Sequence, residues 1–142
     1  MRCRRWGLSL AELLVAIALI GLMALVAVPR FAGARDRVAV ESAVAETIRT
    51  FATARELAVL RRTAVAVVIE PVRASLEVRS RGLVVMRRGL GTAYGVALAT
   101  NRDSVVYDAR GLGFGASNLS LILRRGRVAD TIVVSRLGRT RW

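Results

Sequence analysis

Few residues in this chain can do chemistry, and their types restrict what that chemistry can be. The sequence has no histidine and one cysteine, Cys3, and its 23 basic residues, all arginine, face 10 acidic ones for a net charge of +13. Histidine is the commonest general base and metal ligand, so its absence narrows the options. Asp103, Asp108 and Asp130 show no paired spacing, and no serine lies in a nucleophile motif. We therefore expect no enzyme, no metal site and no cofactor.

One carboxylate has unusual neighbours. Glu12 is the one acid in residues 7–29, a stretch that is apolar nearly throughout, and it lies near the start of that stretch. As a helix, residues 8–28 would be about 31 Å long, the thickness of a bilayer core, and a helix is the only single segment that satisfies its own backbone in lipid. We therefore expect a membrane helix. A carboxylate inside such a helix is costly, so Glu12 is a candidate functional residue.

The sequence around Glu12 resembles the signature of type IV pilins and pseudopilins. Residues 7–12 read Gly-Leu-Ser-Leu-Ala-Glu, after a short basic leader and before the apolar segment. The resemblance implies that a prepilin peptidase cleaves after Gly7 and that Leu8 becomes the N-methylated first residue. It also implies that Glu12 neutralises the terminal amine of a neighbouring subunit during filament assembly. Leu8 replaces the family's usual phenylalanine, and Ala11 stands where a larger aliphatic residue is common.

Physical reasoning supports this resemblance. Cleavage after Gly7 would leave a cationic amine at the membrane edge, one helical turn from the Glu12 carboxylate. An unpaired charge inside a helix bundle is costly, and a paired one much less so. A pair formed between subunits would therefore set their axial register.

An ordinary secretory signal sequence is the alternative. Residues 32–34 read Ala-Gly-Ala, which suits signal peptidase, but a signal core is usually about 7–15 residues and carries no acid. Charge does not settle the orientation, because arginines before and after the segment nearly balance. The resemblance implies a single-pass inner-membrane protein with its C-terminal domain in the periplasm or filament. The arginines concerned are Arg2, Arg4 and Arg5 before the segment, and Arg30, Arg35 and Arg37 after it.

The helix is expected to continue beyond Pro29 to about Leu60, as it does in pilins. Apolar residues recur there at steps of three and four, which indicates a helix with one buried face. They are Val40, Val44, Ile48, Phe51, Ala54 and Ala58. We therefore divide the chain into a leader (1–7), a transmembrane or filament-core helix (8–29), its amphipathic continuation (30–62) and a β-domain (63–142).

The rest of the chain has the pattern of short antiparallel strands separated by turns. Strand 74–80 alternates, with Glu77 and Arg79 expected on a solvated face. One long helix packed against one antiparallel meander gives an α+β, pilin-like fold. The strands are expected at 63–70, 74–80, 83–87, 93–100 and 105–107, followed by 119–123 paired with 130–135 across the turn 124–127.

The β-domain resembles the FimT/GspH group of minor pilins and pseudopilins. Residues 105–111 and 131–135 match loosely, and residues 138–141 match its final Gly-Arg-x-Arg. The resemblance implies a minor pseudopilin of type II secretion or a minor pilin of a type IV pilus. In such pilins the Gly-Arg-x-Arg is associated with binding DNA for natural transformation.

Two interpretations of the C-terminal arginines stay open. Arg139 and Arg141 would contact DNA phosphates, and Trp142 would either stack on a base or pack on the sheet. Arg136 and the turn 124–127 would widen this patch if they lie on the same side. Alternatively these arginines are only solvated, and the chain is a structural minor pilin. The expected partners are other pilin subunits, the prepilin peptidase, inner-membrane lipid and, in the first interpretation, DNA.

Overall fold

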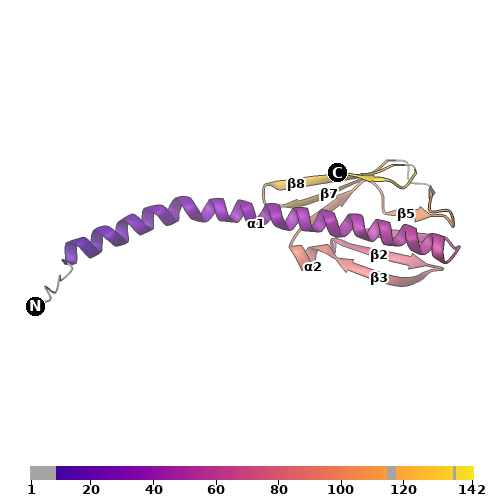
Figure 1. Ribbon diagram of the computed structural model, residues 1–142, viewed down its shortest axis with the longest axis horizontal. Coiled ribbons are helices and arrows are strands. Elements are labelled where there is room, and N and C mark those ends of the chain that lie inside the picture. Colours follow the sequence, from indigo (N-terminus) through magenta and orange to yellow (C-terminus); the bar gives the residue numbers. More distant parts are fainter. Residues whose placement is uncertain (1–8, 115–117, 136) are drawn as a thin grey trace, which may run out of the picture. The chain divides into compact units, whose positions relative to one another are not determined.

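The computed structural model describes residues 9–114, 118–135 and 137–142, and its chain divides into two compact units, Met1–Ala34 and Arg35–Trp142. The main element is α1 (Leu10–Leu60), a 51-residue helix that continues through Pro29 (Figure 1). Within the first unit, every residue from 10 to 25 is exposed. By length and composition, α1 is long and apolar enough to cross a membrane. The structure confirms that the helix continues beyond Pro29 and ends near Leu60.

The part of α1 in the second unit packs against β-strands through the expected apolar stripe. Val40, Val44, Phe51, Ala54 and Ala58 are all buried, and Ile48 is half-buried. Two threonines also lie on this face, and their hydroxyls donate hydrogen bonds to backbone carbonyls four residues earlier. Periodicity alone therefore located this buried face correctly.

The strands form two antiparallel sheets. The five-stranded sheet has the order β3-β2-β1-β5-β6, and the four-stranded sheet has the order β4-β7-β8-β9. Figure 1 shows α1 with β2 and β3 on one side and β7 and β8 on the other. The first sheet contains β1 (Val65–Glu70), β2 (Ser75–Ser80), β3 (Leu83–Gly89), β5 (Ser104–Tyr107) and β6 (Gly113–Phe114); the second contains β4 (Ala97–Thr100), β7 (Leu119–Arg125), β8 (Val128–Val134) and β9 (Thr140–Arg141).

The structure corrects two expectations about the order and bounds of the strands. A single meander is wrong, because the chain leaves the first sheet after β3, returns for β5 and β6, and builds the second sheet from the other strands. The expected strand 93–100 is wrong in its first part, because the short helix α2 (Leu90–Tyr94) precedes β4. Leu90 anchors that helix in the core. The pairing of 119–123 with 130–135 is confirmed by β7 and β8.

The core lies between α1 and the inner faces of both sheets. Burial alternates along β1 and β7, as it does on strands with one face toward a core. Each large apolar side chain buried there contributes about 1.5–3 kcal/mol. The largest fully buried apolar side chains are Tyr107, Phe51, Leu76, Leu90, Leu119, Leu121, Leu123 and Ile132.

Strand β2 is not half-solvated as expected, because Glu77 is completely hidden from solvent. Arg79 donates two hydrogen bonds to Glu77 Oε2, from Nε at 3.0 Å and from Nη2 at 2.7 Å, and Arg87 on β3 pairs with Oε1. The hydrogen bond from Arg79 is the main cause that lowers the pKa of Glu77, against the opposing effect of burial. The two arginines thus cover the carboxylate. Glu77 is therefore shielded from water although it lies on the outer face of the sheet.

Candidate functional site

Of the residues predicted for cleavage and assembly, the structure describes Glu12, which lies in the first turn of α1. Gly7 and Leu8 lie outside the described residues, as does Arg136. Glu12 is exposed in the first turn of the helix, where the partial positive charge of the helix end favours a carboxylate. Within the described part of the chain Glu12 forms no ion pair. The apolar side chains around it are exposed, so this surface needs lipid or other helices to cover it.

The predicted Gly-Arg-x-Arg forms a tight connection from β8 into β9. Gly138 has a φ of 73°, donates a hydrogen bond to the Ser135 carbonyl at 2.9 Å and is buried. A Cβ at this position would lie 2.6 Å from Cε1 of Tyr107, so only glycine fits. The backbone N–H of Ser135 donates to the Arg139 carbonyl, and the Arg139 N–H donates to Ser135 Oγ. Packing against Tyr107 therefore explains the glycine and fixes where Arg139 begins.

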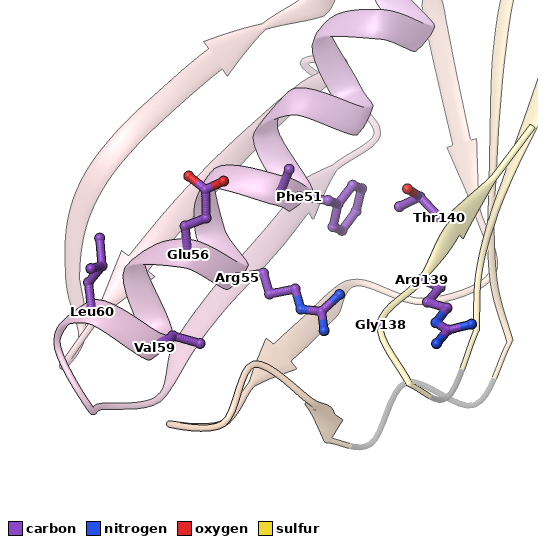
Figure 2. Close-up of a pocket in the computed structure, with 9 residues that line it drawn as sticks. Phe51, Arg55, Glu56, Val59, Leu60, Gly138, Arg139 and Thr140 are labelled. Carbon is purple, nitrogen blue, oxygen red and sulfur yellow. The ribbon is translucent and has the colours of Figure 1, made fainter.

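Arg139 borders an open pocket of about 830 Å³ between the last turns of α1 and the C-terminal segment (Figure 2). Figure 2 shows Arg55 extending from α1 toward the segment that carries Gly138 and Arg139, whereas Glu56 points away from Arg55. The remaining lining is largely apolar, and its residues are Phe51, Ala52, Val59, Leu60 and Thr140. The structure thus brings together two guanidinium groups and an apolar surface.

Arg55 and Arg139 line this pocket, Arg141 lies on β9, and none of the three has an acidic partner among the described residues. Within the described residues, Arg55, Arg139 and Arg141 form no ion pair, and all three are exposed. Arg55 was not predicted as a site residue, because on the helix it falls outside the apolar stripe. Its place one turn after Phe51 is the signal that could have found it.

The arginine-rich turn 124–127 lies elsewhere. Arg125 Nε pairs with Asp36 Oδ1 at 2.9 Å, and Nη1 donates to the Tyr94 carbonyl. Asp36 and Arg55 are separated by 19 positions on one helix, 55 − 36, or about 28 Å. The turn therefore does not join the pocket of Arg55 and Arg139, because it lies beside Asp36, at the other end of the domain.

Trp142 is 75% exposed and does not line the arginine pocket. It borders a smaller hollow of about 290 Å³ with Glu41, Ile48 and Asp130. Trp142 therefore lies beside α1, with most of its ring available to a partner.

Tyr107 lies against Gly138 and is buried. Its hydroxyl has no hydrogen-bond partner among the described residues. Burial raises the pKa of Tyr107 to about 12, and the positive charge of Arg55 opposes that rise. Tyr107 therefore stays neutral at physiological pH and acts as packing for Gly138.

Comparisons with known proteins address the fold. No protein-family model matches the chain, and no curated protein matches its sequence. Two crystal structures of the type IV minor pilin FimU from Pseudomonas aeruginosa (strain PAO1) match its structure. The first has a TM-score of 0.62 at 15% identity and covers 75% of this chain and 89% of FimU; the second has 0.58 at 14%, covering 71% and 90%.

The chain has a type IV pilin-like fold. The expected α+β architecture, a long N-terminal helix packed against antiparallel β-structure, is confirmed. At this identity the likeness concerns the fold, so the roles of Glu12, Arg139 and Arg141 rest on their own chemistry.

Proposed function

We propose that the chain is a minor pilin or pseudopilin subunit of a type IV pilus or type II secretion filament. One observation carries this proposal: the exposed apolar part of α1, with Glu12 in its first turn, belongs to the same helix that packs into a pilin-like sheet domain. A helix of this kind suits both the membrane and the helix bundle of a filament core.

The proposed path begins in the inner membrane, with the C-terminal domain in the periplasm. A prepilin peptidase removes residues 1–7, and the new amine of Leu8 is methylated. In the filament, Glu12 pairs with the amine of a neighbouring subunit. Removing one partner of a buried pair costs about 3–5 kcal/mol, which corresponds to more than about a hundredfold in the assembly equilibrium.

A Glu12→Ala variant tests this role of the carboxylate. We expect its amount in sheared filaments to fall at least about tenfold, at equal amounts of protein in the membrane fraction. Glu41→Ala is the matched control, because Glu41 is an exposed acid on the same helix with only a 3.6 Å surface pair to Arg37. Incorporation of Glu12→Ala at the level of the control would contradict the proposal.

DNA binding is the second candidate function. Its support is that Arg139 and Arg141 are exposed and form no ion pair within the described residues, which leaves both guanidinium groups available for phosphate. Contacts of this kind are independent of sequence and weaken with salt.

The test is fluorescence anisotropy of a labelled oligonucleotide with the full chain in non-ionic detergent, across a salt series. In Arg139→Ala/Arg141→Ala, the slope of log affinity against log salt should fall by about 2, one for each lost phosphate contact. Arg124→Ala/Arg127→Ala removes the same charge at the opposite end of the domain and should change the slope less. Equal slopes in both double variants would remove the DNA interpretation.

A further inference from the structure

The pocket between α1 and the C-terminal segment combines two features that belong together at an interface. Its arginines, Arg55 and Arg139, come from elements far apart in sequence and lack acidic partners in the described structure. Its lining includes aliphatic side chains open to solvent: Leu60 is 80% exposed, and Val59 is also exposed. Arginine is enriched in the cores of protein interfaces, where an apolar surface surrounds it.

The charge of the pocket indicates an anionic occupant. Other arginines of the domain show how a carboxylate satisfies this side chain: Arg87 pairs with Glu77, Arg88 with Glu46 at 2.9 Å, and Arg125 with Asp36. The pocket's one acid, Glu56, points away from Arg55 (Figure 2). An occupant with a carboxylate would supply the missing partner, in the forked geometry that guanidinium groups favour.

The apolar lining favours a protein segment over nucleic acid. Bases bind through exposed aromatic rings, and the only aromatic residue among the described lining residues, Phe51, is buried. Aliphatic side chains such as Val59 and Leu60 provide no stacking platform, but they do match the apolar side chains of a protein.

We propose that this pocket is a docking site for a neighbouring filament subunit, and that it receives a segment carrying an Asp or Glu carboxylate beside an apolar side chain. The carboxylate pairs with Arg55 and Arg139, and the apolar side chain covers Val59 and Leu60. This inference rests on the proposed function as a filament subunit.

Site-directed photocrosslinking of the full chain, expressed with the other subunits of its own system, tests the proposal. A photoreactive phenylalanine derivative at Leu60 reports the pocket. The same residue at Val72, which is fully exposed on the turn after β1 and outside the pocket, is the control. A third probe at Leu14, in the exposed apolar part of α1, reports assembly itself.

We expect the Leu60 probe to crosslink another pilin-like subunit, with the attached peptide, mapped by mass spectrometry, containing an acid. Arg55→Glu/Arg139→Glu should reduce this product at least about tenfold, and reversing the partner's acid to arginine should restore it. Arg124→Glu/Arg127→Glu, with the same charge change, should leave the product unchanged.

The Leu14 probe separates failure of the docking site from failure of the proposed function. If the Leu14 probe crosslinks subunits and the Leu60 probe does not exceed the Val72 control, the docking site is wrong and the filament subunit stands. If neither crosslinks, the filament function fails and the docking site with it. A Leu60 product that survives the Arg55→Glu/Arg139→Glu change would also overturn the pairing. So would an Arg55→Ala variant that lowers the salt slope of DNA binding without any subunit crosslink.

Discussion

Charged residues in the two regions of this chain have different surroundings. In the sheet domain, Glu77, Glu46 and Asp36 each pair with an arginine from a neighbouring strand or turn. Glu12, in the apolar part of α1, has no ion pair within the described residues. The same is true of Arg55, in the pocket between α1 and the C-terminal segment.

This difference separates two classes of charged residue. The first class forms ion pairs within the domain and stabilises the fold, and the second is available to pair with another molecule. A charge with a close partner inside the chain is already compensated, whereas one on or beside an apolar surface becomes costly when that surface is covered. Glu12 and the Arg55–Arg139 pocket fall in the second class. Removing charges of the first class should therefore change stability, and removing those of the second should change association.

The largest loss of stability is expected when Glu77 loses its arginines. Arg79→Ala/Arg87→Ala removes both ion-pair partners of Glu77 and the side chains that cover its carboxylate. Urea denaturation should show a larger loss at pH 7 than for any other variant proposed for the domain. Because the folded pKa of Glu77 lies below its ordinary value of 4.5, its pairing stabilises wild type above that pH and is lost as the pH falls below it. The difference between the two proteins should therefore shrink in acid, and a difference that grows would contradict the pairing.

Tyr107 is an exception that sharpens the comparison, because its buried hydroxyl lacks a partner in the described structure. Its folded pKa of about 12 exceeds the ordinary 10.0, so its contribution is full below pH 10 and is lost as the pH rises toward 12. Two units correspond to about 2–3 kcal/mol. Tyr107→Phe should keep wild-type stability at pH 7 and lose that alkaline dependence in pH-jump denaturation. An unchanged dependence would assign it to another group.

Arg125→Ala is expected to cost about 1–2 kcal/mol, because it removes a partly exposed ion pair with Asp36 and a hydrogen bond to Tyr94. Thermal unfolding beside Arg127→Ala, an exposed neighbour in the same turn, measures it. Equal melting temperatures would show that the turn is merely solvated.

Arg139→Ala should have the smallest effect on folding, within about 0.5 kcal/mol of wild type in the same unfolding assay. The reason is that the side chain has no ion pair in the described structure and is exposed. A loss as large as that of Arg125→Ala would move Arg139 into the class of residues that hold the fold.

The spacing of apolar residues predicted the elements that depend on residues close together in the sequence. The stripe from Val40 to Ala58 and the β7–β8 hairpin both follow from periodicity and short turns. The split into two sheets was not predicted, because it depends on pairing such as that of β1 with β5, which are distant in sequence.

The candidate sites also depend on contacts between residues that are distant in sequence, which the sequence did not predict. Alternation placed Glu77 on a solvated face, but Arg87 on the next strand covers it. The Arg139 motif was visible in the sequence, whereas its meeting with Arg55 requires the C-terminal segment to lie along α1. Charge partners across the fold, rather than residue type, decide what each arginine does.

The central claim is that the chain is a processed filament subunit, and the intact mass and N-terminal peptide of the membrane-bound protein test it most directly. The account predicts a chain that begins at Leu8 and carries a methyl group on its amine. A chain that begins at Met1, or at Arg35 after a signal-peptidase cut following Ala34, would contradict it. The second result would also remove Glu12 and the apolar part of α1, on which the proposed assembly depends.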